Sequence, residues 1–254
     1  MRRLEGKRVV VTGAAGGLGG PLAQRLAGEG AIVTGVDRVH CPNCPNSLIA
    51  DLNDDAALNE LVGALERDTP DILVNVAGVM RFGLHESQPV EALAQCYRVN
   101  LLVPAALARA VAGPMRRRGH GQIVNVGSVL GAIPYPWFAA YSSSKAGLAA
   151  LSQALRRELA DSGVIVTHVN PRAAKTPFNN AEVNRFLDIA KMRADAPDYV
   201  AERIFQAIVH RRSSATIGAM EKVYAALNAV APALIDSGLK GQVRRARAEF
   251  PLSP

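Results

Sequence analysis

The chain has 254 residues, of which 49% are hydrophobic and 20% are charged. This composition excludes a disordered or collagen-like chain, and the length suits one large domain with a sizeable core. Lys and Arg number 29 against 22 Asp and Glu, which gives a net charge of +7. By itself, such a surplus is compatible with nucleic acid, a membrane surface, an acidic ligand or simple solubility.

Segments that would direct the chain to a membrane or out of the cell are not predicted. No apolar run reaches the ~18 residues that a membrane span requires. The start, Met1-Arg2-Arg3-Leu4-Glu5-Gly6, contains no apolar secretory segment, so we expect a cytoplasmic location. Three cysteines are too few for a disulfide framework.

Apolar runs of strand length alternate with helical patterns along the chain. Strands that are buried on both faces of a parallel sheet are rich in Val and Ile and nearly continuous in apolar character. Such runs lie at Arg8–Thr12, Ala31–Val36, Ser47–Ala50, Ile72–Asn75, Gln122–Val126, Val164–Val169 and, more weakly, Ala215–Gly218. Helical patterns lie at Leu18–Gly28, Asp55–Arg67, Pro89–Arg117, Ala140–Ser162 and Asp198–Arg211.

This alternation predicts one α/β domain with a doubly wound parallel sheet of about seven strands, flanked by helices. We place that domain at residues 1–220 and a C-terminal helical tail, packed on the same domain, at 221–254. Two segments do not follow the alternation. Thr176–Ala196 is expected to be a loop with a short helix, and Glu221–Phe250 to hold helices broken at Pro232 and Gly238.

A glycine-rich turn follows the first predicted strand. It reads Thr12-Gly13-Ala14-Ala15-Gly16-Gly17-Leu18-Gly19 and runs directly into a predicted helix. Glycines let the backbone approach a pyrophosphate, and the free N–H groups of the helix N-terminus attract the anion. The position between strand and helix therefore favours dinucleotide binding by Gly13, Gly17, Leu18 and Gly19 over an ordinary flexible loop.

The second predicted strand is followed by an acidic residue, Asp37. A carboxylate at this place accepts hydrogen bonds from the adenosine ribose and repels a 2′-phosphate, so Asp37 favours NAD over NADP. The adjacent Arg38 is able to pair with a phosphate and keeps NADP as the alternative. Asp51 and Leu52, after the short third strand, are placed to reach the adenine.

Tyr141 and Lys145 are four residues apart at the start of a predicted helix. Residues at this spacing share a helix face, and a nearby cation lowers the pKa of a tyrosine toward the working range of a general base. Ser128 follows the fifth predicted strand, at the edge where open α/β sheets bind ligands. This combination predicts a catalytic site.

Together these features resemble those of the short-chain dehydrogenase/reductase family, over residues 5 to about 218. The matching pieces are Thr12-Gly13-xxx-Gly17-x-Gly19, Asn75-Val76-Ala77-Gly78, Asn100, Ser128, Tyr141-xxx-Lys145, Pro171 and Thr176. The resemblance implies a single Rossmann-like sheet and a homodimer or homotetramer. Many family members carry Asp-Gly-Gly after the last strand, where they form tetramer contacts, whereas Gly218 here leads into Ala219-Met220-Glu221.

The resemblance also implies roles for single residues. Tyr141 would be the general acid/base, Lys145 would lower its pKa and hold the nicotinamide ribose, and Ser128 would stabilise the substrate oxygen. Asn100 would hold a water that links Lys145 to solvent. Further cofactor contacts would come from Asn75, Ala77 and Gly78 on the adenosine side, and from Pro171 and Thr176 near the nicotinamide.

The usual Pro-Gly after the sixth strand is Pro171-Arg172 in this chain. We favour a displaced, solvent-seeking Arg172 side chain over a clamp for a substrate carboxylate. The rest of the expected substrate pocket is apolar and predicts a bulky, mostly apolar or cyclic alcohol or ketone beneath a movable lid at Phe178–Met192. Its residues are Met80, Val129, Leu130, Trp137, Phe138 and Phe178.

Two further patterns are not explained by this chemistry. Cys41 and Cys44 are two of three cysteines, and a zinc site needs four ligands, so we expect an ordinary loop with free thiols, no metal, and a reversible disulfide only as the alternative. The basic clusters lack interleaved aromatic residues, so nucleic acid is not expected. The tail is expected to cover the cleft or a partner, with peripheral membrane attachment as the alternative.

The sequence therefore predicts an NAD(P)-dependent oxidoreductase that interconverts a secondary alcohol and a ketone, with NAD preferred. The runner-up hypothesis is a nucleotide-sensing or binding protein on the same fold that does not turn over a substrate. The complete set of Asn100, Ser128, Tyr141 and Lys145 argues for the enzyme.

Overall fold

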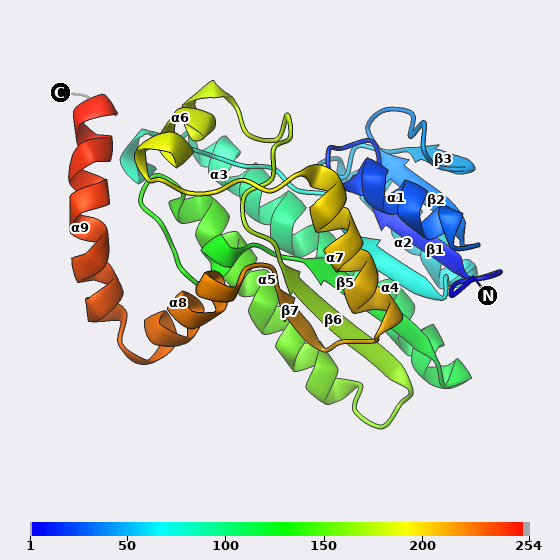
Figure 1. Cartoon of the computed structure of the whole chain (residues 1–254). Helices are drawn as coiled ribbons and strands as arrows, with labels where there is room; N and C mark the ends of the chain where they lie inside the picture. Colours follow the sequence, from blue (N-terminus) through cyan, green and yellow to red (C-terminus); the bar gives the residue numbers. More distant parts are fainter. Residues whose placement is uncertain (1, 251–254) are drawn as a thin grey trace.

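A seven-stranded, fully parallel sheet forms the centre of the molecule, which we describe from a computed structural model that covers residues 2–250 (Figure 1). The strands lie in the order β3-β2-β1-β4-β5-β6-β7. Met1, at the start of the predicted domain (1–220), and 251–254, at the end of the predicted tail (221–254), lie outside the described residues. The strands are β1 (Arg8–Thr12), β2 (Ile32–Asp37), β3 (Asn46–Ile49), β4 (Ile72–Asn75), β5 (Gly121–Val126), β6 (Val164–Asn170) and β7 (Ser214–Thr216).

Helices cover both faces of this sheet, which confirms the predicted doubly wound fold. On one face, α1 (Gly19–Gly28) packs against α7 (Pro197–Val209) over a core that includes Val11 and Phe205. On the other face lie α2 (Asp55–Arg67), α4 (Val103–Arg118) and the end of α5 (Ala139–Glu158). Because every residue of β4 and β5 is buried, these strands show the continuous apolar pattern seen in the sequence.

The strand order reverses between β1 and β4, and this reversal positions the site. From β1 the chain proceeds outward to β2 and β3, then returns to β4 on the other side of β1. The loops at the carboxyl ends of β1 and β4 therefore diverge and leave a crevice, which is where open α/β sheets bind ligands.

Two predicted helices differ from those observed. The single helix predicted at Pro89–Arg117 is α3 (Val90–Tyr97), a π-helical turn at Arg98–Leu102, and then α4. The predicted break at Gly238 was wrong, because α9 (Pro232–Glu249) continues through it, whereas Pro232 does begin a new helix after α8 (Ala219–Val230). A glycine inside a helix costs only about 1 kcal/mol, which neighbouring packing can offset.

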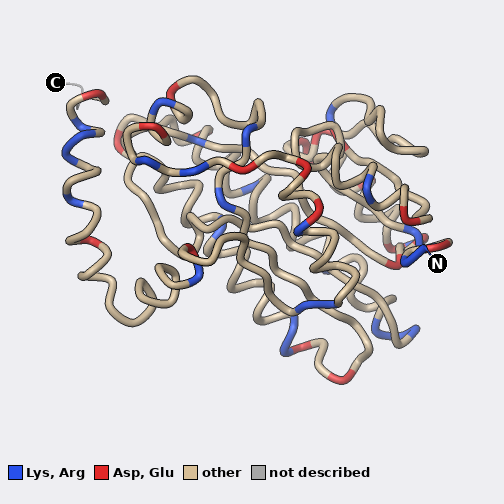
Figure 2. The backbone as a smooth tube through the Cα atoms, viewed as in Figure 1, with Lys and Arg blue, Asp and Glu red and all other residues tan. Residues whose placement is uncertain are grey.

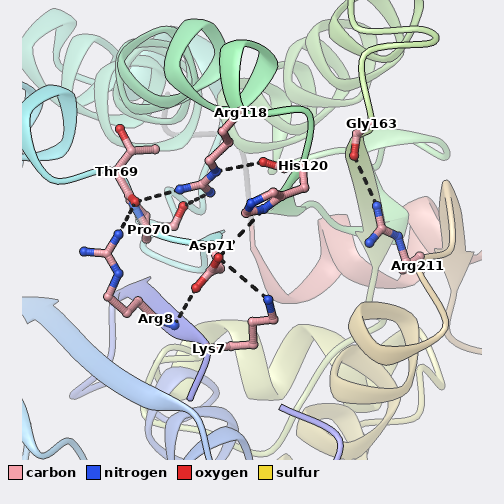
Figure 3. Close-up of polar contacts among 9 residues, drawn as sticks. All are labelled: Lys7, Arg8, Thr69, Pro70, Asp71, Arg118, His120, Gly163 and Arg211. Carbon is pink, nitrogen blue, oxygen red and sulfur yellow. Dashed lines mark hydrogen bonds and ion pairs between the residues drawn. The ribbon is translucent and has the colours of Figure 1, made fainter. Parts of the chain in front are cut away.

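The amino ends of the strands, opposite the crevice, are tied together by polar contacts (Figure 3). The Asp71 carboxylate accepts a hydrogen bond from the Arg8 N–H at 2.9 Å and lies 3.9 Å from both Lys7 and His120. Arg118 donates to three backbone carbonyl oxygens, those of Thr69, Pro70 and His120. Part of the basic surplus is therefore used to join β1, β4 and β5.

The C-terminal helices extend beyond the sheet and return toward its carboxyl edge. In Figure 1, α9 stands beside α6 (Ala181–Ile189), and the two helices are in contact. Tyr135 donates to Gln242 of α9 at 2.6 Å, and Arg185 of α6 pairs with Glu249. Figure 2 shows Lys and Arg at several turns of α9. Within residues 2–250, no helix is long and apolar enough to cross a bilayer.

Candidate active site

A cleft of about 290 Å³ opens at the carboxyl edge of the sheet. Its walls come from the glycine-rich turn after β1, the loops after β2, β3, β4, β5 and β6, helices α3 and α5, and the segment that contains α6. Of the predicted site residues, those along the cleft are Gly13, Gly17, Leu18, Gly19, Asp37, Arg38, Asp51, Leu52, Ala77, Gly78, Met80, Ser128, Val129, Leu130, Phe138, Tyr141, Lys145, Pro171, Arg172, Thr176 and Phe178.

The glycine-rich turn fits a pyrophosphate because side chains have no space there. A Cβ atom on Gly13 would lie 2.8 Å from the Ala77 backbone, and one on Gly17 would lie 2.6 Å from the Thr176 Cβ. Gly13 also has a φ of +70°, a conformation that L-residues rarely adopt. Leu18 precedes α1 without a side-chain capping bond, and the first turn holds no acidic residue, so its N–H groups suit an anion.

Asp37 lies at the end of β2, against the glycine-rich turn. Its carboxylate accepts hydrogen bonds from the N–H of Ala15 at 3.0 Å and of Arg38 at 2.7 Å. The same side chain lines the cleft, with Arg38 next to it and Asp51 and Leu52 along the same wall. The carboxylate therefore fixes the turn. It also presents negative charge to the cleft on the β2 side of β1, whereas Tyr141 follows β5 on the other side of β1.

Asn75 does not reach the cleft, contrary to the prediction. Its side chain is buried between β4 and β5, where Nδ2 donates to the Oδ1 of Asn125 at 2.8 Å. The wall at this point is formed by Val76, Ala77 and Gly78. Side chains alternate along a strand, so a motif that spans the end of β4 divides its residues between the sheet interior and the cleft.

Ser128, Tyr141 and Lys145 meet at the buried end of the cleft. Tyr141 and Lys145 lie in the first turns of α5, and the Lys145 ammonium is 5.9 Å from the centre of the Tyr141 ring. Lys145 donates to the carbonyl oxygen of Val126 at 3.0 Å, at the end of β5. Ser128 lines the cleft together with Tyr141, and its Oγ accepts from the Leu130 N–H at 3.1 Å. The predicted helix face thus points at the serine.

Burial dominates the acid–base properties of this group. It raises the pKa of Tyr141 to about 12, although the hydrogen bond from Ser128 acts in the opposite direction. Burial also lowers the pKa of Lys145 to about 8, against a smaller opposing effect of Cys96. The expected lowering of the tyrosine pKa by Lys145 is therefore not found, because desolvation disfavours the charged form of each group.

Asn100 lies behind the cleft wall and holds the backbone of Val79. Its Oδ1 accepts from the Val79 N–H at 2.8 Å, and its Nδ2 donates to the Val79 carbonyl oxygen at 2.9 Å and to Ser144 at 3.0 Å. The side chain is completely buried. The π-helical turn brings Asn100 to this position, so the observed contacts join the loop after β4 to α5.

The predicted apolar pocket is formed, with one exception. Trp137 is buried in an aromatic cluster with Phe82, Phe138, Phe186 and Phe250, and does not line the cleft. Its φ of +66° is a left-handed conformation, which points the side chain in a different direction from that of extended backbone. Phe138 belongs to the same cluster and does reach the cleft.

Several cleft residues were not predicted individually. Val183, Leu187 and Met192 belong to the predicted lid, and the first two share one face of α6, a helical spacing that could have identified them. Gln95 has no such signal, since it lies on α3, and its position depends on a hydrogen bond from Arg81. Neither a lone amide nor a single arginine marks a site in sequence.

The favoured interpretation of Arg172 as a solvent-seeking side chain was wrong. Its guanidinium forms two hydrogen bonds to Asp195, at 2.8 and 2.6 Å, and one to Glu221 at 3.3 Å. Only 24% of the side chain is exposed. Two carboxylates that lie far along the chain hold this cation, and nothing near Arg172 in the sequence indicates them.

Cys41 and Cys44 are free thiols in the loop between β2 and β3. Cys41 is buried, and a Cβ atom on Gly35 would lie 2.5 Å from the Cys44 Sγ, so the loop packs closely on β2. Burial, with a smaller effect from Cys41, raises the pKa of Cys44 to about 11. A thiol of this kind is a poor nucleophile at neutral pH.

Known proteins share both the sequence pattern and the architecture. The 2,3-dihydro-2,3-dihydroxybenzoate dehydrogenase of Bacillus subtilis is 35% identical over 189 residues, 68% of this chain and 72% of that protein. The 3beta-hydroxysteroid dehydrogenase 1 of Eggerthella lenta is 35% identical over 192 residues, 69% of this chain and 74% of that protein. A short-chain dehydrogenase from Sphingobium yanoikuyae, solved with NADPH, has a TM-score of 0.78 at 27% identity, over 91% of this chain and 95% of that one.

A family-wide pattern of short chain dehydrogenases matches residues 7–185. This range extends from β1 into α6 and contains the glycine-rich turn, Ser128, Tyr141 and Lys145. The match covers more than half of the chain, and relatives with over 30% identity cover more than two thirds of it. The chain therefore belongs to the short-chain dehydrogenase family.

Proposed function

We propose that the chain is an NAD(P)-dependent oxidoreductase that interconverts a secondary alcohol and a ketone on a bulky, mostly apolar or cyclic substrate. The observation that carries this proposal is the meeting of Ser128, Tyr141 and Lys145 at the buried end of a cleft whose other end is a glycine-rich turn. The two relatives named above act on a dihydrodiol and a hydroxysteroid, both cyclic, which supports this substrate class.

The roles of the residues follow from what each side chain can donate or accept. A nicotinamide bound along the cleft would supply the hydride acceptor or donor. Tyr141 takes the proton from the alcohol, or returns it to the ketone oxygen, and Ser128 donates a hydrogen bond to that oxygen. Lys145, one turn further along α5, would hold the nicotinamide ribose beside Tyr141. Met80, Leu130 and Phe138 exclude water from the substrate.

Substitution of Tyr141 by Phe tests the acid/base role. The change removes only the phenolic oxygen, so we expect turnover of alcohols with NAD to fall by about 10²-fold or more. The Kd for NADH, measured by fluorescence titration, should remain within about twofold because Tyr141 lies outside the phosphate-binding turn. A broad panel of alcohols and ketones without any NADH signal in the wild type would instead favour the nucleotide-sensing alternative.

We further propose that NAD is preferred over NADP, because the Asp37 carboxylate lines the cleft beside the glycine-rich turn. Asp37→Asn keeps an oxygen that accepts from the Ala15 N–H but removes the negative charge. We expect the Kd for NADPH to fall about tenfold and the Kd for NADH to rise. Tighter binding of NADPH than of NADH by the wild-type chain would overturn the preference, and would point to Arg38.

We also propose that the chain forms a homodimer or homotetramer. Met220, Val223 and Tyr224 are exposed apolar residues on the outward side of α8, and Val90 and Leu102 are exposed near α3, which supports an apolar contact between copies. Light scattering after gel filtration measures the mass, and a monomer at micromolar concentration contradicts the proposal. Co-sedimentation with anionic vesicles would instead indicate the membrane alternative for the tail.

A further inference from the structure

Arg172 stands at the point where the chain leaves the sheet and enters the lid. It is the second residue after β6 and lines the cleft, and the next residues, Ala173 and Ala174, lie on the same wall. The chain then passes through α6 and comes back to this point. There the Asp195 N–H donates to the Ala173 carbonyl oxygen at 2.8 Å, and the Lys175 N–H donates to the Asp195 carbonyl oxygen at 2.9 Å. The segments that come directly before and after the lid, Phe178–Met192, are therefore held side by side.

The Arg172 guanidinium binds carboxylates from two different segments. Nε and Nη2 donate to the two oxygens of Asp195, at 2.8 and 2.6 Å, which is the paired geometry that a planar guanidinium favours. Nη1 donates to the Oε1 of Glu221 in the first turn of α8, at 3.3 Å. The three side chains are mostly buried, with 24%, 11% and 23% exposed, so these pairs are less screened than surface pairs.

The local structure around Glu221 is arranged to bring its carboxylate inward. The second oxygen, Oε2, is buried and has no hydrogen-bond partner among the described residues. A Cβ atom on Gly218 would lie 1.9 Å from this oxygen, and Gly218 has a φ of +110°. Glycine at this position thus permits both the turn from β7 into α8 and the close approach of Glu221.

The charges in this cluster argue against a role for Arg172 as a clamp for an anionic substrate. One guanidinium faces two carboxylates, Asp195 and Glu221, so its positive charge is already compensated. The hydrogen bond to Asp195, followed by that to Glu221, raises the pKa of Arg172, so the group remains charged in this arrangement. Its donors serve the protein rather than a ligand.

We propose that Arg172 is a positioning residue that couples the lid to the C-terminal helices at the substrate end of the cleft. By binding Asp195 and Glu221 at once, it holds the segment directly after the lid and the first turn of α8 in one arrangement. These two segments therefore open together. The benefit to catalysis rests on the proposed function, whereas the coupling itself is a property of the folded chain.

Amide hydrogen exchange of the full chain, followed by mass spectrometry with and without NADH, tests the coupling. In Arg172→Met we expect exchange to become about tenfold faster in both 187–195 and 219–230. Glu221→Met leaves the Arg172–Asp195 pair intact, and we expect exchange in 187–195 to rise about threefold even so. Arg172→Lys keeps the charge but not the paired geometry and should fall between wild type and Arg172→Met.

Arg25→Met provides a matched control. Arg25 also binds two carboxylates, Glu29 and Glu202, both at 2.7 Å, but it joins α1 to α7, so exchange in 187–195 should not change. If Glu221→Met accelerates exchange only in 219–230, the two segments are independent and the proposal is overturned, whatever the kinetics show.

Kinetics separate this proposal from the proposed function. For an alcohol that the wild type oxidises, we expect Arg172→Met to raise KM about tenfold while the Kd for NADH changes less than twofold. Coupled exchange without turnover of any substrate would leave the positioning role supported and remove the enzymatic proposal. Turnover of a substrate without coupled exchange would support the enzymatic proposal and remove the positioning role of Arg172.

Discussion

His168 is a buried base inside the sheet, and its pKa makes the stability of the fold depend on pH. The side chain is 4% exposed, with Nε2 2.9 Å from the Oδ1 of Asn170 and Nδ1 3.1 Å from the Oγ of Ser152. The amide oxygen accepts, so Nε2 carries the proton of a neutral ring. Burial lowers the pKa from 6.5 to about 4, and the nearby Lys145 and Arg156 act in the same direction.

Acidification should therefore destabilise the chain through His168. Its folded-state pKa of about 4 is below the unfolded value of 6.5, so the unfolded chain takes up the proton first as the pH falls. This contribution to stability is present above pH 6.5 and is lost toward pH 4, with a loss of about 2 kcal/mol by pH 5. Urea unfolding of the wild type at pH 7 and pH 5 measures it.

In His168→Gln, the difference between the unfolding free energies at pH 7 and pH 5 should be smaller by about 2 kcal/mol. The stability of this variant at pH 7 will also fall, because its hydrogen bonds are altered. His210, exposed at the end of α7, offers the control, and His210→Gln should keep the wild-type difference. If His168→Gln loses as much unfolding free energy between pH 7 and pH 5 as the wild type, other groups cause the pH dependence.

Single residues were predictable where a motif and the end of a strand coincide. Tyr141 and Lys145 follow from helical spacing, and Gly13, Gly17 and Asp37 from their places after β1 and β2, and all of these lie along the cleft. Trp137 was misplaced because its left-handed backbone conformation leaves no mark in the sequence. The partners of Arg172 were missed because they are distant along the chain.

Among the elements, the strands were the most predictable. The bounds of β1 and β4 agree with those expected from the apolar runs, since buried parallel strands are apolar on both faces. The π-helical turn before α4 was not predictable, because Asn100 and its hydrogen bonds to the Val79 backbone stabilise it, and these depend on a loop that is distant in sequence. Tertiary contacts override local propensity in such cases.

The glycine-rich turn contacts the segment that leads into the lid, and this contact can be tested through Gly17. An alanine Cβ there would lie 2.6 Å from both Cβ and Cγ2 of Thr176. Thr176 must then move, so we expect Gly17→Ala to weaken NADH binding about tenfold or more and to lower the unfolding free energy by about 1–3 kcal/mol. Fluorescence titration and urea unfolding measure the two effects.

Gly28, the last residue of α1, is the matched control, because a Cβ atom there meets nothing within 4 Å. Gly28→Ala should leave NADH binding unchanged and should raise stability by up to about 1 kcal/mol. Equal losses of affinity in both variants would mean that α1 itself, and not the contact with Thr176, controls the cofactor end of the cleft.

At the scale of the whole molecule, the basic surplus of +7 is divided among several structural tasks. Arg118 and Lys7 join strands at the amino edge of the sheet, Arg172 binds the lid and α8, and further cations lie along α9 (Figures 2 and 3). Helix C-termini, such as that of α4 with Arg116 and Arg117, account for others.

The tail closes the molecule around an aromatic cluster that lies directly behind the substrate end of the cleft. Phe250, at the end of α9, contacts Phe82 at 5.1 Å and Trp137 at 6.4 Å between ring centres. Trp137 is the only tryptophan of the chain and is 6% exposed. Its fluorescence therefore reports whether α9 remains packed on the cluster.

Phe250→Ala removes this contact from the cluster. We expect the Trp137 emission to shift to longer wavelength, acrylamide quenching to increase and the unfolding free energy to fall by about 2 kcal/mol, because buried aromatic area is lost. Leu234, on the same helix but 62% exposed, is the control, and Leu234→Ala should change none of these. The Kd for NADH should stay the same in both variants, since Phe250 does not line the cleft. An unchanged Trp137 spectrum in Phe250→Ala would show that the tail is not what shields the cluster from solvent.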